Sequence, residues 1–490
     1  MTKRWIDLAP AAQSAWQAVT RRSLLPWMLV LVSLGVRLYY LQLTYMQPVW
    51  WDEAEYLIKA RNIALGTPDT GFYAGRPLFL SVAMAAVYAA GLGELTIRGA
   101  MVVASVATVL LTYRIGCRLV GRNAAFVGAW LFGMFYVPLF YGTRILTEIP
   151  HLALCLLGLH LFLVRRPLAT TLSVPVLTFA VFTRFTAGLM LVVLALYVTV
   201  SEGIAALRRR EYWLGAVLGM LVAVPFAVPF LQAWEASQYM MPGRDLAERI
   251  HSLWQNAAWM GRSFGWVLTA LWAGGVVLLL ARVIRQGSTG PADQTNPRRE
   301  GLVVLWLMVP MLYFGLMVPW NVSSDRYLIL ALPSAFLAIG YCTVRLGSLA
   351  AWGHAGVTAV VMLVVVGLGT LRFLPDADNR IRSRVASYDG LRDVGLWIKE
   401  RTGPEDIVLS RSVAQLTYYS TRRGESIPDE RPAFDAMMKT LTPRYVVISG
   451  YEEHPTWILD TSAESLGLRT IEGFPEGRPV AVILEPALLP

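Results

Sequence analysis

Long apolar segments alternate with short polar ones along most of the chain. Many of these apolar runs hold 17 residues or more, and a helix of that length crosses a hydrocarbon core of about 30 Å. The pattern predicts eleven membrane-spanning helices, at residues 26–46, 99–115, 124–141, 149–164, 169–183, 186–202, 212–232, 264–284, 302–319, 327–345 and 352–371. The region 26–371 is therefore predicted to be an all-α polytopic membrane domain.

The run Leu78–Leu92 is the ambiguous segment in this pattern. It is short and rich in small residues, and counting it as a crossing would place the later Lys and Arg clusters outside the cell. We interpret it as an interfacial or re-entrant helix, which leaves the N-terminal residues 1–25 and the basic clusters in the cytoplasm, in keeping with the excess of Lys and Arg in cytoplasmic loops.

This topology leaves three sizeable segments on the outer face and one notable cytoplasmic loop. The first outer segment is the loop 47–98. The second, 233–263, is rich in Trp and charge and is predicted to form amphipathic helices at the membrane surface. The cytoplasmic stretch 286–299 is rich in Gly, Ser, Pro and Asn, which is typical of a flexible linker.

The third outer segment, residues 372–490, has the composition of a soluble domain. Residues 387–401 have a helical apolar period, and short β-branched runs at 407–410, 445–449 and 480–484 are bounded by Pro and Gly. We therefore expect a small extracytoplasmic α/β domain at the C-terminus.

Composition supports this class of protein. The chain of 490 residues is 56% hydrophobic and only 16% charged, with a mean hydropathy of +0.50, whereas soluble domains carry about 25% charged residues. The net charge of +10 comes mostly from short clusters between apolar runs, which are topology signals rather than a surface for nucleic acid. The three cysteines provide neither a disulfide framework nor metal-ligand spacing.

Ionisable residues next to the outer ends of the predicted spans are the candidates for chemistry, because charges at membrane depth are costly. Carboxylates and arginines at one interface suit the transfer of a group to or from an anionic lipid. A carboxylate takes a proton from an acceptor hydroxyl, and guanidinium groups hold a phosphate leaving group. The set comprises Asp52, Glu53, Glu55, Arg76, Arg144, Glu148, Arg184, Asp325 and Arg326.

Several motifs occur in an order that matches a known family. After a first span and an outer loop that opens with Asp-Glu come GRPL, then RILTEIPHLALCLLGLHLFL, then FTRFTAG, then SDRYLILALP. Over residues 26–345 this order resembles the C-type (GT-C) membrane glycosyltransferases. The nearest branch includes protein O-mannosyltransferase-like proteins, lipid A aminoarabinose transferases and rhizobial galacturonosyltransferases.

The resemblance implies inverting glycosyl transfer at the outer face of the plasma membrane. The donor would be a sugar on polyprenyl phosphate, and the acceptor a hydroxyl or phosphate of a glycan, lipid or protein. It implies catalytic roles for Asp52, as the base, and Glu148. It also implies a donor-phosphate contact for Arg76 and matches Arg184 and Arg326 to basic positions at outer span ends. With the charged neighbours of these residues, the predicted substrate-binding set is Glu53, Arg76, Arg144, Arg184 and Arg326.

No cofactor is certain from the sequence, and a divalent metal is one alternative. The aminoarabinose transferases have a Glu implicated in metal binding just before the basic residue that corresponds to Arg76, whereas this chain has Gly75. Glu148 and His151 lie three residues apart, a spacing compatible with a metal site, although a hydrogen-bonding role for His151 is the simpler interpretation.

Structural interpretations remain open beside the catalytic ones. Asp52, Glu53 and Glu148 could simply occupy the first turns of helices, where the helix dipole favours acidic residues. Arg184 could be a residue whose long side chain extends to the lipid headgroups. For the whole protein, the alternatives are a transporter or flippase of a lipid-linked saccharide and a scaffold that presents its outer domain. Transporters usually place charged or helix-breaking residues near the bilayer midplane, which this pattern lacks.

Overall fold

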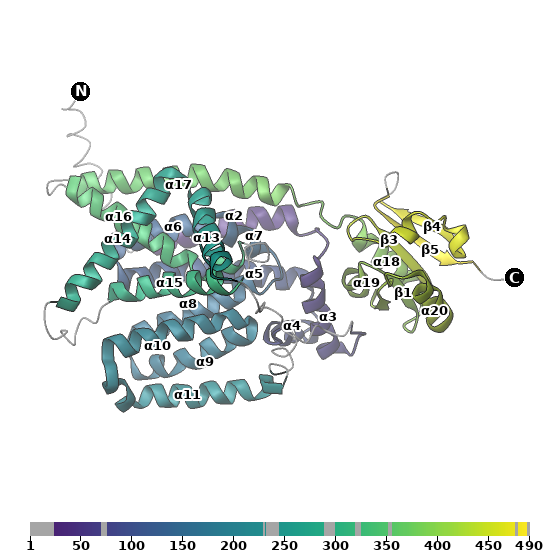
Figure 1. Cartoon of the computed structure of the whole chain (residues 1–490), viewed down its shortest axis with the longest axis horizontal. Coiled ribbons are helices and arrows are strands. Elements are labelled where there is room, and N and C mark those ends of the chain that lie inside the picture. Colours follow the sequence, from purple (N-terminus) through teal and green to yellow (C-terminus); the bar gives the residue numbers. More distant parts are fainter. Residues whose placement is uncertain are drawn as a thin grey trace, which may run out of the picture.

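The computed structural model describes residues 24–69, 76–228, 231, 245–288, 299–318, 325–350, 355–475 and 479–487. Within them, a bundle of helices carries a smaller domain with a five-stranded sheet at one end (Figure 1). The bundle contains α2 (Leu24–Thr44), α3 (Trp51–Leu65), α4 (Phe79–Ala89), α5 (Glu94–Leu119), α6 (Arg122–Met134), α7 (Tyr136–Phe140), η1 (Tyr141–Thr143), α8 (Glu148–Val164), α9 (Pro167–Thr183), η2 (Phe185–Ala187), α10 (Gly188–Glu202), η3 (Gly203–Arg208), α11 (Arg210–Ala223), η4 (Val224–Phe226), α13 (Leu246–Phe264), α14 (Trp266–Ser288), α15 (Arg299–Met317), η5 (Tyr327–Leu330), α16 (Leu332–Ala350) and α17 (Ala355–Arg382).

Among the described residues, seven helical segments are long and apolar enough to cross a membrane. The bent pair Arg122–Met134 and Tyr136–Thr143 makes an eighth if it forms one span, and the apolar helices α8 and α9 have 17 residues each. Each of the eleven predicted spans coincides with a helical segment. The all-α polytopic membrane fold is therefore confirmed, while the number of eleven crossings stays a prediction.

Two helices lie where the sequence predicts segments that do not span the membrane. Helix α4 has 11 residues and is therefore about 16 Å long, which is too short for a straight crossing of about 30 Å. Helix α13 begins where the Asp245 side chain accepts a hydrogen bond from the Glu248 backbone N–H at 2.7 Å. Its buried residues are spaced four apart, at Ser252, Asn256, Met260 and Phe264, as in an amphipathic helix. Residues 232–244 lie outside the described part of the chain.

Glycines allow helices α6 and α16 to pack at very short range. A Cβ atom on Gly340 would lie 2.1 Å from the carbonyl oxygen of Ala124, and one on Gly128 would lie 2.7 Å from that of Phe336. Because both obstacles are backbone atoms, a side-chain rotation does not relieve the clash. Small residues at helix crossings are the usual means of close association in membrane bundles.

The chain bends by 55° between α6 and α7, at Phe135. Phe135 has an extended backbone, and its ring contacts those of Phe264, Phe336 and Phe373 at centroid distances of 5.8, 5.3 and 5.1 Å. These aromatic contacts fix the bend between three other parts of the bundle. The bend leads into η1 and the segment before α8, which carries part of the candidate site.

The C-terminal domain contains a mixed sheet with the strand order β2-β1-β3-β5-β4. Strand β1 pairs in parallel with β2 and β3, whereas β5 is antiparallel to β3 and β4. The predicted strands at 407–410, 445–449 and 480–484 correspond to β1, β3 and β5, while β2 and β4 were not predicted. The elements are α18 (Leu391–Arg401), β1 (Ile407–Ser410), α19 (Val413–Ser420), β2 (Arg423–Glu425), α20 (Arg431–Leu441), β3 (Tyr445–Ser449), α21 (Thr456–Leu459), η6 (Glu464–Leu466), β4 (Leu468–Phe474) and β5 (Ala481–Pro486).

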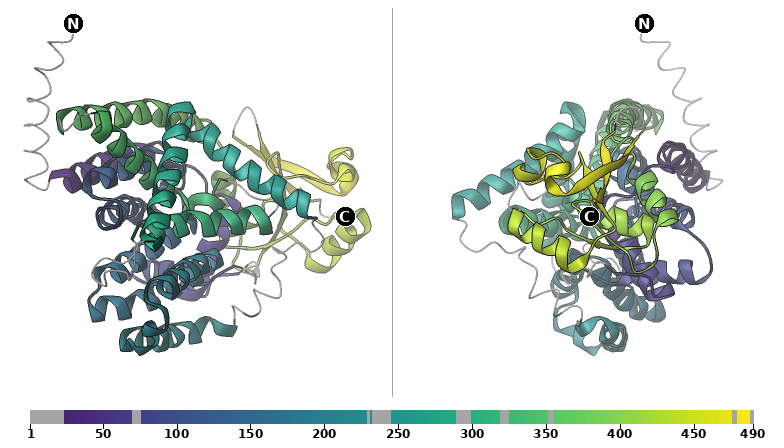
Figure 2. Two further views of the ribbon diagram at one scale, coloured as in Figure 1. Left: turned by 60° about the vertical axis from the view of Figure 1, so that its left-hand side comes forward. Right: turned by 90° about the vertical axis from the view of Figure 1, so that its right-hand side faces the viewer.

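Helix α19 connects this domain to the first-loop helices α3 and α4. The Val49 N–H donates to the Tyr419 hydroxyl at 2.9 Å, and the hydroxyls of Tyr418 and Tyr88 lie 3.1 Å apart. Arg61 donates to the carbonyl oxygen of Tyr418 at 2.7 Å. Figure 2 shows the sheet domain against this end of the helical bundle, so the first loop and the C-terminal domain form one packed unit.

We predict that Gly340→Ala destabilises the protein by about 1–3 kcal/mol, because the new methyl group meets backbone atoms of α6 and the two helices must move apart. Gly35→Ala in α2 is the matched control, since a Cβ atom there has nothing within 4 Å. Thermal unfolding of both purified variants in detergent measures the effect. Equal Tm values for the two variants would contradict the close packing.

Candidate active site

A cavity of about 460 Å³ lies where α3, α8, α10, α15 and η5 meet. One part of its wall is charged or polar and another part is apolar, including Leu189, Tyr313, Phe314 and Val318. Five of the seven predicted site residues line it: Asp52, Arg76, Glu148, Arg184 and Arg326.

The first turn of α3 supplies one carboxylate group of the cavity. Asp52 and Glu55 are three residues apart and therefore lie on the same helical face. Arg76 bridges them, with its Nη2 atom 2.8 Å from Asp52 Oδ1 and its Nε atom 2.7 Å from Glu55 Oε2. The guanidinium also lies 5.4 Å from the centroid of the buried Tyr56 ring.

Arg326 joins this group to a second one at the start of α8. Its Nη1 atom lies 3.1 Å from Asp52 Oδ2, and its Nε atom lies 3.9 Å from Glu148 Oε1. Glu148 is buried and also pairs with Arg184 at 2.8 Å, while Arg184 donates to the Thr147 hydroxyl at 3.0 Å. The charges thus alternate along a continuous chain: Glu55, Arg76, Asp52, Arg326, Glu148 and Arg184.

The arginines keep Asp52 ionised. Burial alone would raise the pKa of its carboxyl group, but the charges and hydrogen bonds of Arg76 and Arg326 outweigh burial and hold that pKa below its ordinary value. Burial raises the pKa of Glu55, and the charge of Arg76 opposes this only in part. Of the two carboxylates that Arg76 bridges, Asp52 is therefore the one that remains charged more firmly.

Neighbouring side chains fix the loop that carries Arg326. Asp325 accepts hydrogen bonds from the hydroxyls of Tyr136 at 2.7 Å and Tyr141 at 2.9 Å. The ring of Tyr327 lies 5.5 Å from the Arg326 guanidinium. The contacts of Asp325 and Tyr327, the residues before and after Arg326, thus fix the backbone there and direct the Arg326 guanidinium toward Asp52.

Glu53 and Arg144 do not line the cavity. Glu53 is fully buried, and its carboxylate accepts hydrogen bonds from the backbone N–H groups of Trp50 and Ile145, both at 2.7 Å. Arg144 is buried too, with its guanidinium 3.8 Å from the centroid of the Trp50 ring, and burial lowers its pKa to about 10. The observed contacts of both residues hold the protein backbone and an aromatic ring in place behind the cavity.

Three residues that the sequence left without a role belong to the charged chain or touch it. Glu55 shares Arg76 with Asp52, Thr147 accepts a hydrogen bond from Arg184, and Tyr56 lies under Arg76. The spacing of Asp52 and Glu55 on one helix was the available signal for Glu55. No local pattern in the sequence pointed to Thr147 or Tyr56.

In the described part of the site, the side chains that could bind a metal are engaged with other groups. Within the described residues, no group of three or more His, Cys, Asp or Glu side chains is arranged to hold a metal ion. Asp52 and Glu148 are each paired with arginines, and His151 Nδ1 lies 2.8 Å from the carbonyl oxygen of Thr147 in its own helix. Gly75 lies outside the described residues.

We predict that Glu53→Gln destabilises the protein by about 1–3 kcal/mol, because the two backbone N–H groups bind different carboxylate oxygens and the amide NH2 group replaces one of them, so that one buried N–H loses its partner. The control is Glu400→Gln, since that side chain is 74% exposed. Thermal unfolding in detergent is the measurement. A Glu53→Gln variant as stable as the control would show that the carboxylate does not hold α3 and the Ile145 backbone together.

Comparison with known proteins reveals similarity in structure only: no protein-family model and no curated protein matches the chain. Crystal structures of ArnT from Cupriavidus metallidurans, a lipid A aminoarabinose transferase, are similar over nearly their whole length. The form bound to undecaprenyl phosphate has a TM-score of 0.66 and 15% identity, covering 93% of this chain and 97% of that one. The apo form has a TM-score of 0.61 and 15% identity, covering 95% and 98%.

A third similar structure is the oligosaccharyltransferase of Archaeoglobus fulgidus in complex with Zn and sulfate. Its TM-score is 0.58 at 12% identity, and the match covers 86% of this chain and 68% of that one. Identities this low establish a common fold and no more. The fold expected from the motif order is thereby confirmed, and the chain has the fold of the GT-C membrane glycosyltransferases.

Proposed function

We propose that the protein is an inverting glycosyltransferase that moves a sugar from a polyprenyl-phosphate donor to an acceptor hydroxyl at the outer face of the plasma membrane. The observation that carries the proposal is the cavity in which Asp52 lies between Arg76 and Arg326 beside an apolar wall. One cavity thus offers a candidate base, cations for a phosphate and a surface for a lipid chain. An acceptor phosphate oxygen is the less favoured nucleophile, because it brings no proton for Asp52 to remove.

The donor phosphate would bind to the arginines of the cavity. Arg76, Arg184 and Arg326 present planar guanidinium groups, which hold phosphate oxygens with two parallel hydrogen bonds. The apolar wall next to them, which includes Leu189, Phe314 and Val318 on α10 and α15, suits the first units of a polyprenyl chain. The undecaprenyl phosphate in the similar ArnT structure supports this class of donor.

Binding of the donor would also release the base. In the donor-free protein, both carboxylate oxygens of Asp52 are held by Arg76 and Arg326. A phosphate that takes hydrogen bonds from the same arginines competes with Asp52 and adds negative charge beside it. The pKa of Asp52 then rises and one of its oxygens becomes free to accept a proton.

In the transfer step, the acceptor oxygen attacks the anomeric carbon as the bond from that carbon to the phosphate oxygen breaks. The acceptor proton passes to Asp52, and the bonding electron pair leaves with the polyprenyl phosphate. Arg76 and Arg326 would stabilise the charge that develops on the phosphate. Since a phosphate is a fair leaving group, the step needs no separate general acid, and attack opposite the leaving group inverts the anomeric centre.

Glu148 is best placed to position the arginines. Its Oε1 atom pairs with Arg184 at 2.8 Å and lies 3.9 Å from Arg326, whereas its buried Oε2 atom has no hydrogen-bond partner among the described residues. We propose that this carboxylate offsets the repulsion between Arg184 and Arg326 and holds both guanidinium groups at the cavity, where they can bind one phosphate group. Glu148 would then affect catalysis only indirectly, by positioning Arg184 and Arg326.

The transporter alternative predicts charged residues near the midpoints of spans. In this cavity the ionisable residues lie at helix ends: Asp52 and Glu148 open α3 and α8, Arg184 follows α9, and Arg326 precedes η5. The arrangement therefore favours chemistry at one face of the bundle over passage through its centre.

We predict that Asp52→Asn lowers transfer about 10²–10⁴-fold, the usual contribution of general base catalysis. The assay follows label from radiolabelled polyprenyl-phosphate sugars to acceptors in native membranes. Asp69→Asn is the matched control, because Asp69 pairs with Lys59 at 2.7 Å in the same loop and lies outside the cavity. Equal transfer by both variants would remove Asp52 as the base. Donor crossing the bilayer without transfer would favour the transporter.

We predict that the pH profiles of kcat and kcat/KM have different acid limbs. The limb of kcat/KM reports the free protein, in which Arg76 and Arg326 hold the pKa of Asp52 low. The limb of kcat reports the complex, in which the phosphate shares these arginines, so it lies at higher pH. Arg326→Gln should move the limb of kcat/KM upward, because Asp52 loses a cation. Superimposed limbs, unchanged by Arg326→Gln, would contradict release of the base by the donor.

A further inference from the structure

Aromatic rings form a column that runs from α7, past the residue that precedes α3, to the C-terminal domain. The Phe140 ring in α7 contacts that of Trp50 at a centroid distance of 5.8 Å, and Trp50 contacts Tyr388 at 6.4 Å. Tyr388 in turn contacts Tyr451 at 5.2 Å. The column therefore links four parts of the chain that are far apart in sequence: the start of α3, helix α7, the turn after α17 and the loop after β3.

The inner end of this column is anchored close to Asp52. The guanidinium of Arg144 lies 3.8 Å from the centroid of the Trp50 ring, and that of Arg384 lies 5.7 Å from it. The backbone N–H of Trp50 is fixed by Glu53 at 2.7 Å. Cations thus cover the Trp50 ring and hold it in place, so that it supports the Tyr388 ring. Trp50 lies two residues before Asp52, the proposed base.

Tyr388 is held in an unusual backbone conformation. Its φ angle of +63° lies in the left-handed region, which costs about 1–3 kcal/mol for a residue that is not glycine and persists only where neighbours hold it. Its side chain remains partly exposed. Burial, with the charges of Glu452 and Asp52 added, raises the pKa of its hydroxyl, so both carboxylates lie within electrostatic reach of this ring.

The loop after β3 adds polar groups beside the two tyrosines. Tyr451 donates its hydroxyl hydrogen to the carbonyl oxygen of Asp389 at 2.9 Å, which fixes its ring. Glu452 and His454 are partly exposed; among the described residues, Oε1 of Glu452 and Nδ1 of His454 have no hydrogen-bond partner, and both atoms are shielded from solvent. This loop follows the carboxyl end of a strand in the parallel part of the sheet, a preferred place for ligands in α/β domains.

We propose that Tyr388, Tyr451, Glu452 and His454 form an acceptor subsite and that the acceptor is a saccharide. The apolar face of a sugar ring would pack on the partly exposed tyrosines, and its hydroxyl groups would bond to the partly exposed side chains of Glu452 and His454. The column would then direct a further hydroxyl toward Asp52. This inference rests on the proposed transferase function and adds the chemical class of the acceptor.

A saccharide fits this surface better than an extended peptide. Peptides that bind to sheets usually pair with a free edge strand through backbone hydrogen bonds. Strand β3, which ends at this loop, is flanked by β1 and β5 and offers no free edge. The groups available here are aromatic rings, a carboxylate and an imidazole, all of which recognise a ring with several hydroxyls.

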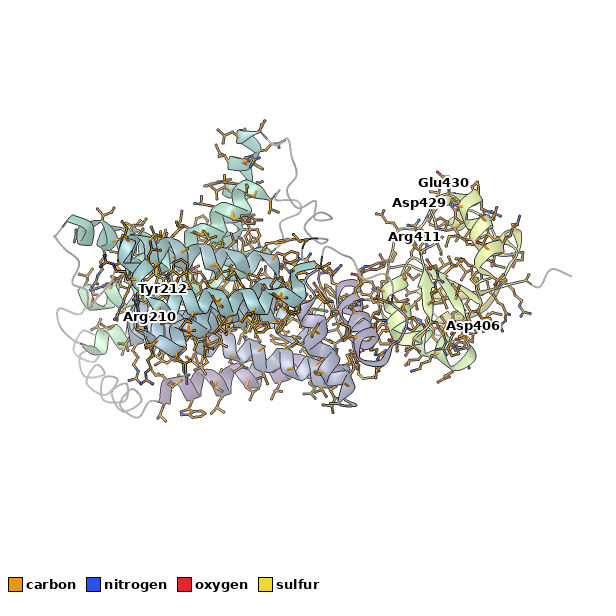
Figure 3. The ribbon with its side chains drawn as sticks, turned by 90° about the horizontal axis from the view of Figure 1, so that it is seen from below. Arg210, Tyr212, Asp406, Arg411, Asp429 and Glu430 are labelled. Carbon is orange, nitrogen blue, oxygen red and sulfur yellow. The ribbon has the colours of Figure 1, made fainter. Side chains whose placement is uncertain are left out.

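The test measures sugar binding directly in the full chain in lipid nanodiscs. The probes are the methyl glycosides of glucose, galactose, mannose and N-acetylglucosamine, and a short peptide containing Ser and Thr. Saturation-transfer NMR detects their contacts at millimolar concentration. The variants are Tyr388→Ala and Tyr451→Ala, with Tyr388→Phe and Tyr451→Phe as conservative changes. The control is Tyr212→Ala, since Figure 3 places Tyr212 at the opposite end of the molecule from the C-terminal domain.

We expect the protein to bind at least one glycoside, with a Kd that rises about tenfold in each Ala variant and less than threefold in the Phe variants and in Tyr212→Ala. Binding of the peptide alone, of no probe, or of glycosides with equal strength by all variants would overturn the inference. Binding of undecaprenyl phosphate is measured on the same samples. If the protein binds sugar but not undecaprenyl phosphate, the proposed donor is contradicted. If it binds undecaprenyl phosphate but no sugar, only the acceptor subsite is contradicted.

Discussion

The pairing of buried charges in one cavity is the interaction on which the rest of the site depends. An isolated charge away from water costs several kcal/mol, so each carboxylate here requires a cation and each guanidinium requires an acceptor. Arg326 is central, because it lies 3.1 Å from Asp52 and 3.9 Å from Glu148 and so joins the two carboxylate groups. The helices that carry these residues must therefore meet at their ends, which fixes the packing of this part of the bundle.

The same pairing of charges determines how readily the site binds an anion. Its arginines already have internal partners, so an anionic ligand must displace a carboxylate from them before it gains their hydrogen bonds. Weak anions gain little from this exchange, whereas a ligand that also places a long apolar chain against α10 and α15 gains additional binding energy. Under the proposed function, charge pairing within the protein would thus favour a lipid phosphate over a free phosphate in solution.

Much of the fold follows from simple patterns in the sequence. Apolar period and length predicted the helices, and β-branched runs predicted β1, β3 and β5, whereas β2 is only the polar triplet Arg423–Glu425 and is recognisable only beside β1. Charge at the ends of spans selected the five residues that line the cavity. It also selected Glu53 and Arg144, because a charge that supports the backbone and one that faces a cavity look the same in sequence. Charge and helical spacing made Glu55 a candidate, but its pairing with Arg76, which ties it to Asp52, is visible only in the structure.

The hydrogen bond from the Val49 N–H to the Tyr419 hydroxyl joins residues 370 positions apart. During synthesis from the N-terminus, the segment that leads into α3 is made early, whereas α19 emerges only near the end of translation. The helix that carries Asp52 therefore lacks one of its supports until almost the whole chain has been made. A prematurely terminated chain would therefore have an incomplete candidate site even where all its helices had formed.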